Sequence, residues 1–425
     1  MLRVPDYPRN EAIEVNRSYL PYKDALGWLY GLQQFGIKPG LESIGRLLTA
    51  LDILKSAGRV IHVAGTNGKG SVCAMVESIL RAHGYRTGLF TSPHLVTFRE
   101  RIRVNDEMIS QDDVAADLNI IRNLISDWDP HPTFFEITTA LALKHFSEAK
   151  VDVMILETGM GGRLDATNIV PSTVSVITSI DFDHQKWLGK TLRDIATEKA
   201  GIIKPNTPVV SARQRGAAEK VIRARAAECE APLRFVTQSH EASPIALRGA
   251  HQRHNAALAI AAVRAANIEI DNVAIVRGLI SVEWPARFQR YDSRIVLDGA
   301  HNPAAARVLV NAWREVFSDQ RAVVILAVLS DKDLRGICQA LAPIADYILL
   351  PIIRSSRAAD PETLARIFSK ITPSLHHSIT LSVAEAIDKA RARTAPILIT
   401  GSLHFAGEAL AHLRGQPAAF EECAQ

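Results

Sequence analysis

The chain contains 425 residues, of which 47% are hydrophobic and 22% charged, a composition typical of soluble globular domains. The chain is longer than a domain with one hydrophobic core usually is, so we expect two domains. The net charge of +4 comes from 49 basic and 45 acidic residues without long runs of one sign. This balance gives little support to a nucleic-acid partner and suits a small anionic substrate equally well.

The cysteines and the apolar segments indicate the compartment. Cys73, Cys229, Cys338 and Cys423 lie far apart and form no metal-type pairs, which argues against a disulfide framework and against a zinc site. Residues 1–10 contain two prolines and mixed charge where a signal peptide needs an apolar run, and the longest apolar stretches have the length of strands. We therefore expect a cytoplasmic protein that has no membrane partner. We also expect a monomer, although no feature of the sequence indicates the oligomeric state.

The first part of the chain alternates between strands and helices. Apolar residues at three- and four-residue spacing predict helices over 22–32 and 41–54. A β-branched run over 59–64 predicts a strand, which is followed by a glycine loop and by a helix that Gly84 can end. Strands over 87–92, 151–157 and 172–180 repeat the alternation, so we expect a mostly parallel sheet.

A break in the helical pattern over 283–294 separates a second α/β segment. Beyond it, strands are expected over 294–298, 322–328, 346–352 and 395–400. Asn302 is placed to cap the first helix of this segment, with Pro303 at the first helical position. We therefore predict an α/β fold in which a P-loop-type, mostly parallel sheet domain (1–284) is joined by a linker (285–294) to a smaller Rossmann-like α/β domain (295–425).

The glycine loop has the composition of a phosphate-binding loop. Gly65, Gly68 and Gly70 permit close backbone approach, Lys69 supplies a mobile positive charge, and a helix begins near Ser71. The loop does not match the usual Walker pattern, which places a glycine five residues before the Gly-Lys pair and a Ser or Thr directly after it. A strand-to-helix turn without a ligand is the alternative interpretation.

Polar residues at other strand ends are further candidates. Glu157 ends an apolar strand at the edge where parallel sheets bind ligands, although it could simply cap the glycine turn that follows. Asp181, Asp183 and His184 share one turn after the next strand, where a histidine is more often a solvated or hydrogen-bonded group.

Lys199 is unusual because it falls on the apolar face of a predicted helix. Leu192, Ile195, Ala196 and Lys199 follow the i, i+3, i+4, i+7 rule. Burial disfavours the charged form of a lysine and lowers its pKa, so a role in chemistry is expected. The alternative is a side chain that extends to solvent from the helix end, just before Gly201.

The second domain offers its own cluster. Asp298, His301 and Asn302 lie at a strand end and a helix start, and capping by Asn302 explains only one of the three. Asp331, Lys332 and Ser402 follow other strands toward the same cleft and remain without an assigned role at this stage.

Five of these segments together resemble a known family. Residues 62–71, 88–105, 157–168, 181–205 and 297–303 resemble folylpolyglutamate synthase and dihydrofolate synthase, members of the Mur ligase superfamily. The superfamily uses a compact G-T-x-G-K loop, which accounts for the mismatch with the Walker pattern. The resemblance covers nearly the whole chain in order.

The resemblance implies a function: ATP-dependent ligation of L-glutamate to a folate-type acid through an acyl phosphate, with ATP and two Mg²⁺ ions as cofactors. It assigns ATP contacts to Gly65, Thr66, Asn67, Gly68, Lys69, Gly70, Ser71, Asn255, Arg287, Asp298 and His301. It assigns Mg²⁺ binding to Ser92, Glu157 and His184, and catalysis to Lys69, to His184 and to Lys199 as a carbamate.

The acceptor site is expected from two further segments. Residues 131–143 and 161–168 resemble the versions in enzymes that act on both dihydropteroate and reduced folates, so we expect a bifunctional enzyme. Phe134 or Phe135 could stack on the flat heterocycle and Asp165 could accept hydrogen bonds from its ring N–H groups. The alternatives are core packing for the phenylalanines and an N-cap for Asp165. The full set of candidate substrate-binding residues is Thr133, Phe135, Asp165, Asn302 and Ser402.

Other functions remain open at this stage. A folylpolyglutamate synthase without the dihydrofolate synthase activity, or another amino-acid ligase of the Mur type, would share most of the motifs. A P-loop switch or kinase would turn over ATP without an added amine. A nucleotide-binding module without catalysis would form no amide with any substrate.

Overall fold

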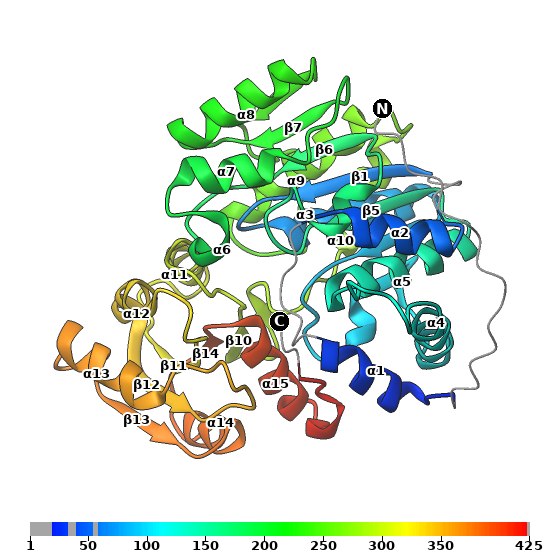
Figure 1. Ribbon diagram of the computed structural model, residues 1–425. Helices are drawn as coiled ribbons and strands as arrows, with labels where there is room; N and C mark the ends of the chain where they lie inside the picture. The colour runs from blue at the N-terminus through cyan, green and yellow to red at the C-terminus, as the bar shows by residue number, and fades with distance from the viewer. Residues whose placement is uncertain (1–18, 33–39, 54–57, 423–425) are drawn as a thin grey trace.

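The computed structural model describes residues 19–32, 40–53 and 58–422 (Figure 1). Within them the chain forms an eight-stranded sheet in the order β4-β3-β2-β5-β1-β6-β7-β8 and a six-stranded sheet in the order β13-β12-β11-β14-β10-β9. Each sheet carries helices on both faces, so the expected arrangement of two α/β domains is confirmed. Residues 1–10 and Cys423, on which two sequence arguments rested, lie outside the described residues.

The sheet of the first domain is mostly parallel, as predicted. The exceptions are the antiparallel pairs β2–β3 and β3–β4 at one edge. Its strands are β1 (Arg59–Ala64), β2 (Thr87–Phe90), β3 (Ile102–Val104), β4 (Glu107–Met108), β5 (Val153–Glu157), β6 (Val174–Ile177), β7 (Val209–Ala212) and β8 (Leu233–Val236). Of these, β3, β4, β7 and β8 were not predicted from the sequence.

Alternation along β1 distributes apolar side chains to both faces of this sheet. Val60 packs with the helices on one face, whereas Ile61 and Val63 pack with those on the other. The first face is covered by α1 (Tyr22–Gly31), α2 (Glu42–Ala50), α4 (Gln111–Leu124) and α5 (Phe134–Glu148). The second is covered by α3 (Lys69–His83), α9 (Ala250–Ala265) and α10 (Asn272–Ser281). Next to them lie α6 (Gln185–Leu188), α7 (Leu192–Ala200) and α8 (Gly216–Glu228).

The helix after the glycine loop, α3, is buried along most of its length. It packs so closely on α10 that a Cβ atom at Gly278 would lie 2.5 Å from the Cα atom of Ile79. Only glycine permits this backbone approach. The tight contact fixes α3, and with it the loop at its N-terminus, against the body of the domain.

The second domain repeats the same three-layer plan. Its strands are β9 (Gln289–Arg290), β10 (Ile295–Leu297), β11 (Ala322–Leu326), β12 (Ala345–Pro351), β13 (His377–Thr380) and β14 (Ile397–Thr400). One face carries α11 (Pro303–Phe317), α12 (Leu334–Leu341) and α13 (Pro361–Ile371), and the other α14 (Val383–Arg391) and α15 (Leu403–Leu413). The expected cap is present, because Asn302 Oδ1 accepts a hydrogen bond from the amide of Ala305 at 2.8 Å.

The segment predicted as a linker contains a short strand. The last helix of the first domain, α10, ends at Ser281, and β9 pairs antiparallel with β10 inside the second sheet. The predicted helices over 22–32 and 41–54 appear as α1 and α2, and residue 54 lies outside the described residues.

The carboxyl ends of β1, β5 and β6 meet at the edge of the first sheet that faces the second domain (Figure 1). Val63 of β1 is in register with Glu157 of β5 and with Val176 of β6. The glycine loop, Glu157 and the turn that contains Asp183 are therefore brought to one place. Among the described helices, none combines the length and the apolar character that crossing a membrane requires.

Candidate functional site

A cavity of about 560 Å³ lies between the two domains and collects most of the predicted site residues. Its walls come from the glycine loop, the ends of β5 and β6, α7, α9, the 285–288 connection and the start of α11. The predicted residues that line it are Gly65, Thr66, Asn67, Gly68, Lys69, Gly70, Ser71, Ser92, Glu157, His184, Lys199, Asn255, Arg287, Asp298 and His301.

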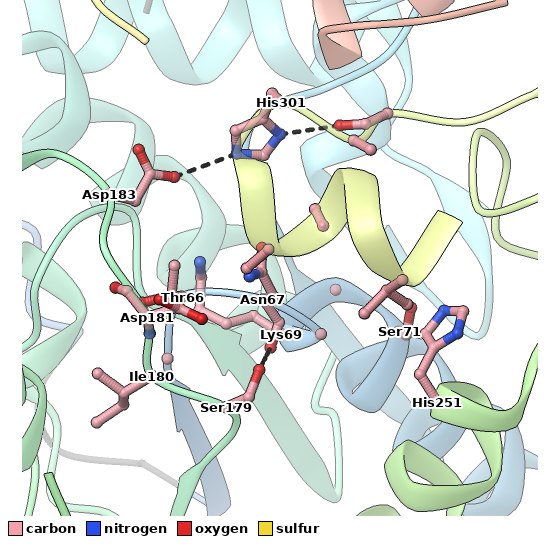
Figure 2. Close-up of a pocket in the computed structure, with 18 of the residues that line it drawn as sticks. Thr66, Asn67, Lys69, Ser71, Ser179, Ile180, Asp181, Asp183, His251 and His301 are labelled. Carbon is pink, nitrogen blue, oxygen red and sulfur yellow. Dashed lines mark hydrogen bonds and ion pairs between the residues drawn. The ribbon is translucent and has the colours of Figure 1, made fainter. Parts of the chain in front are cut away.

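The glycine loop is held in one conformation by the segment that follows β6. The amide of Thr66 donates to the carbonyl oxygen of Ser179 at 2.9 Å, and its hydroxyl donates to the carbonyl oxygen of Asp181 at 3.0 Å (Figure 2). Gly68 adopts a left-handed conformation, with φ of 91°, directly before α3 begins. The N-terminus of α3 therefore points its free amides into the cavity, which is the arrangement that binds phosphate.

Glu157 places its carboxylate next to Lys69, and Ser92 lies beside the same carboxylate. The Nζ atom of Lys69 lies 3.9 Å from Oε1 of Glu157, and the amide of Ser92 donates to Oε2 at 3.2 Å. Burial raises the pKa of Glu157, while Lys69 acts in the opposite direction. A buried carboxylate in this position is stabilised by any further cation that enters the cavity.

These donors fit a hard divalent cation such as Mg²⁺, which prefers carboxylate and hydroxyl oxygens together with water and phosphate oxygens. Within the described residues, no three His, Cys, Asp or Glu side chains form a ready-made metal site. Mg²⁺ in nucleotide sites is commonly bound through one or two carboxylates together with water and phosphate oxygens.

Lys199 is buried, as its helical position predicted. Its side chain lies in the interior with 4% exposure, and its Nζ atom donates to the carbonyl oxygen of Gly65 at 2.7 Å. Burial, and secondarily the charge of Lys69, lower the pKa of Lys199 to about 7. At neutral pH a large share of this lysine is therefore an uncharged amine, the form that reacts with carbon dioxide.

Asp183 joins the two domains at the other side of the cavity. Its Oδ1 atom lies 2.6 Å from Nζ of Lys332. Its Oδ2 atom lies 3.4 Å from Nε2 of His301 (Figure 2) and accepts a hydrogen bond from the side-chain amide of Asn302 at 3.3 Å. Burial on its own would raise the pKa of Asp183, but His301, His184 and Lys332 together hold it well below its usual range. The carboxylate is thus ionised and surrounded by donors from the second domain.

The ion pair between Lys332 and Asp183 was not predicted from the sequence. Its motif was noted as facing the cleft, but no local pattern connects it with Asp183, 149 residues earlier. The domains also meet at the glycine loop itself, because the side-chain amide of Asn302 donates to Oδ1 of Asn67 at 3.0 Å. Asn302 therefore caps α11 and contacts the loop at the same time.

His184 precedes α6 and lies at the mouth of the cavity. Its backbone is left-handed, with φ of 49°, and its ring lies 3.9 Å from Oδ1 of Asp183, with 38% of the side chain exposed. Partial burial and the nearby cations lower its pKa to about 4, although Asp183 acts in the opposite direction. The ring is therefore neutral at physiological pH, as an imidazole metal ligand must be.

The wall formed by α9 presents polar side chains to the glycine loop. Asn255 donates to Oε1 of Gln252 at 2.9 Å, and Gln252 in turn lies 3.3 Å from the hydroxyl of Ser71. His251 lies beside Ser71 at the same wall (Figure 2), and burial together with Arg287 lowers its pKa to about 4. His251 was not predicted, because a single histidine near a helix start has no distinctive spacing.

Arg287 is held in a constrained part of the connection between the domains. Its neighbours Ala286 and Phe288 have φ values of 55° and 46°, which are unusual for residues other than glycine. Asp298 stabilises this bend, since its carboxylate accepts hydrogen bonds from the amides of Phe288 at 2.8 Å and Ala300 at 2.9 Å. Asp298 thus positions Arg287 as well as lining the cavity.

Two candidate substrate-binding residues, Thr133 and Ser402, cap helices and do not line the cavity. Thr133 forms a capping box with Glu136 at the start of α5. Ser402 caps α15 by accepting from the amide of Phe405 at 3.1 Å, next to the cavity-lining Leu403.

Phe135 and Asp165 lie together, also outside the cavity lining. The ring of Phe135 packs so closely on Gly159 that a Cβ atom there would lie 2.6 Å from it. The carboxylate of Asp165 accepts from the amides of Gly159 at 2.9 Å, Met160 at 3.0 Å and Thr167 at 3.1 Å. Asp165 therefore serves as the N-cap that the sequence left as an alternative, and its direct contact with a heterocycle stays a prediction.

The sequence matches two models of known protein domains. The Mur ligase middle domain model matches residues 63–228, and the model of the Mur ligase glutamate ligase domain matches residues 286–403. The dihydrofolate synthase/folylpolyglutamate synthase of Bacillus subtilis is 37% identical over 421 residues, which cover 91% of this chain and 98% of that protein.

The fold also resembles solved structures of similar sequence. Escherichia coli FolC in complex with DHPP and ADP has a TM-score of 0.83 and 34% identity, over 93% of this chain and 98% of that one. The bifunctional folylpolyglutamate synthase/dihydrofolate synthase of Yersinia pestis, complexed with AMPPNP and Mn ion, has a TM-score of 0.83 and 32% identity over the same shares of the two chains.

Proposed function

Because the chain belongs to the dihydrofolate synthase/folylpolyglutamate synthase family of Mur ligases, we propose that it uses ATP to join L-glutamate to dihydropteroate and to reduced folates. The observation that carries this proposal is the single cavity in which the glycine loop, Lys199 and Glu157 of one domain face His301 of the other. A site of this kind holds a nucleotide against an acceptor while both domains exclude water.

The reaction needs activation because a carboxylate has no adequate leaving group. The γ-phosphoryl group of ATP passes to an oxygen of the acceptor carboxylate, which gives an acyl phosphate and ADP. The amine of glutamate then attacks the carbonyl carbon, loses a proton and expels inorganic phosphate as the amide forms. An acyl phosphate hydrolyses readily, so closure of the cavity protects it.

Charge neutralisation is the main contribution of the protein to the phosphoryl step. We propose that Lys69 and the amides at the start of α3 bind the transferring phosphoryl group. Arg287 would complete this binding site when the domains close. Ser92, Glu157 and His184 would hold Mg²⁺, which supplies further positive charge next to the phosphates. Asn255 and His251 are assigned to the nucleoside.

Lys199 is assigned as a carbamate. Its uncharged Nζ atom attacks the carbon of CO₂ and releases a proton, which leaves a carboxylate on the side chain. The remaining N–H can still donate to the carbonyl oxygen of Gly65, 2.7 Å away, and the negative charge would lie near Lys69. The pKa of about 7 supports this assignment, because carbamate formation requires the neutral amine.

We extend the proposal to organisation and compartment. The domains are assigned as 1–284 and 295–425 with the linker at 285–294. We also propose that the protein acts as a monomer. The wide spacing of the cysteines supports the reducing cytoplasm.

The test is a product mass spectrum after incubation with ATP, Mg²⁺, L-glutamate and either dihydropteroate or a reduced folate. We expect a product heavier by one glutamyl residue with each acceptor. A product only with the reduced folate would restrict the function to folylpolyglutamate synthase. ATP turnover without glutamate, and without an amide product, would support a kinase or a switch instead.

A further inference from the structure

Residues 94–98 lie between the domains, because Phe98 packs in the core of the first domain whereas Leu95 and Val96 pack in the core of the second. Leu95 and Val96 share an apolar cluster with Phe405, Leu410 and Phe420, which lie in and after α15. The contact is so close that a Cβ atom at Gly407 would lie 1.7 Å from the carbonyl oxygen of Leu95. This segment is therefore a further contact between the domains, besides the covalent connection at 285–288 and the contacts of Asp183 and Asn302.

Glu421, near the end of the described chain, fixes this segment by its side chain. Its carboxylate accepts from the amide of Phe98 at 2.6 Å, from the hydroxyl of Thr97 at 3.0 Å and from the hydroxyl of Tyr22 at 3.0 Å. Phe98 and Tyr22 are buried, so the amide of Phe98 and the hydroxyl of Tyr22 depend on Glu421 as their hydrogen-bond acceptor.

The backbone of Glu421 adds two contacts. Its amide donates to the carbonyl oxygen of Val96 at 2.8 Å, and its carbonyl oxygen lies 3.2 Å from Nε2 of His94. Figure 1 shows α15 beside α1 of the first domain. One residue of the second domain thus contacts both ends and the middle of residues 94–98.

The anchored segment leads directly to the proposed metal ligands. Ser92 lies two residues before His94, and its amide contacts Glu157 at 3.2 Å. A smaller cavity of about 40 Å³ is lined by residues of both parts, among them Ser92, Glu157, His94 and Leu95. Movement of residues 94–98 would therefore displace Ser92 relative to Glu157.

We propose that Glu421 is a positioning residue that anchors residues 94–98 and thereby holds Ser92 beside Glu157 in the geometry that the catalytic cation needs. The inference rests on the proposed function for the role of the cation, whereas the anchoring itself does not. Glu421 lines neither cavity and acts through its contacts with residues 94–98.

The experiment compares Glu421→Ala, Glu421→Gln and the matched control Glu422→Ala, whose side chain is exposed one residue later. Amide hydrogen exchange of Ser92 and residues 95–98 is measured on the ligand-free proteins. The Mg²⁺ concentration for half-maximal amide synthesis, the KM for glutamate and the Tm are measured in parallel.

We expect Glu421→Ala to speed exchange at Ser92 and Phe98 and to raise the half-maximal Mg²⁺ concentration by about tenfold, the scale of one hydrogen bond to a charged group. The KM for glutamate should stay unchanged. Glu421→Gln, which keeps an acceptor oxygen, should fall between Glu421→Ala and the wild type, and Glu422→Ala should match the wild type. If Glu421→Ala does not fold, Tyr22→Phe removes one donor and should produce a smaller change in the same direction.

A lower Tm with unchanged exchange at Ser92 and an unchanged Mg²⁺ requirement would reduce Glu421 to an ordinary structural contact and overturn the inference. Equal effects of Glu422→Ala would do the same. Exchange is measured without substrates, so it decides the anchoring even if the wild-type protein makes no amide, a result that would overturn the proposed function instead.

Discussion

The ammonium group of Lys332 lies 2.6 Å from the carboxylate of Asp183, and each side chain is only 7% exposed, so a buried ion pair joins the two domains at the edge of the cavity. Removal of one partner from a buried pair leaves an uncompensated charge and costs about 3 to 5 kcal/mol. Here that cost would oppose the closed arrangement of the domains. Lys332→Met should therefore reduce amide synthesis strongly, as measured by kcat/KM for glutamate.

Two further variants make this prediction specific. Asp183→Asn combined with Lys332→Met should recover part of the loss, because neither charge is then left alone. Arg357→Ala removes the exposed pair with Asp331, at 3.1 Å, and should change little. If Lys332→Met behaved like Arg357→Ala, the ion pair would have no role in the closed state.

Lys69 is the only cation of the glycine loop 65–71, and its side chain enters the cavity beside Glu157. Lys69→Ala should cost about 3 to 4 kcal/mol in the transition state, the scale seen when one preorganised charge-stabilising group is removed. Folding should survive, although the Tm should fall, because Lys69→Ala removes the cation that lies 3.9 Å from the buried Glu157. Lys190→Ala, which changes an exposed lysine near α6, is the control. Amide synthesis by Lys69→Ala within about tenfold of the wild type would contradict the role of Lys69 in phosphoryl transfer.

The carbamate on Lys199 can be observed directly with carbon-13 bicarbonate. We expect a labelled signal that grows from about pH 6 to about pH 8 at fixed dissolved CO₂, because the fraction of neutral amine rises through the pKa of about 7. Lys199→Ala should lose the signal and the activity, and small carboxylates added in solution should restore part of the activity.

Lys204 provides the matched control for this label. Its pKa is also lowered, to about 8, mainly by burial, and its Nζ atom donates to the carbonyl oxygen of Asn168 at 2.7 Å. Lys204→Ala should keep the labelled signal of the wild type. Full activity of Lys199→Ala, or a signal that disappears only in Lys204→Ala, would contradict the assignment.

The same lysine makes stability depend on pH in CO₂-free buffer. The pKa of Lys199 is about 7 in the folded protein and 10.5 for a lysine in the unfolded chain. Between these two pH values the unfolded chain therefore binds more protons than the native state. The contribution of Lys199 to stability therefore rises as pH increases from about 7 to about 10.5 and is least favourable below that window. The Tm of the wild type minus that of Lys199→Met should rise with pH across the window, and a constant difference would contradict the shift.

The sequence predicted those parts of the site that depend on one segment. The glycine loop, the strand-end position of Glu157, the apolar helical face of Lys199 and the cap by Asn302 all follow from local spacing. The contacts that close the site depend on two segments far apart in the chain, as between Asp183 and Lys332 or Glu421 and Phe98. No periodicity marks such pairs, because they are fixed by the packing of one domain on the other.

The weaker strands escaped prediction for a related reason. Strand β13 has a half-buried, polar sequence, and β9 is a two-residue edge strand within the predicted linker. Neither carries enough apolar residues to show a pattern, and each forms because a neighbouring strand offers hydrogen-bonding groups.

The central claim is that the acceptor carboxylate is activated as an acyl phosphate in the cavity between the domains. Dihydropteroate labelled with oxygen-18 in its carboxylate tests this directly, in the presence of ATP, Mg²⁺ and L-glutamate. When glutamate displaces the phosphate, the bond between the carbonyl carbon and the bridging oxygen breaks, so one labelled oxygen should appear in the inorganic phosphate for each amide formed. Amide formation with unlabelled phosphate, or no amide from dihydropteroate, ATP and glutamate, would contradict the account.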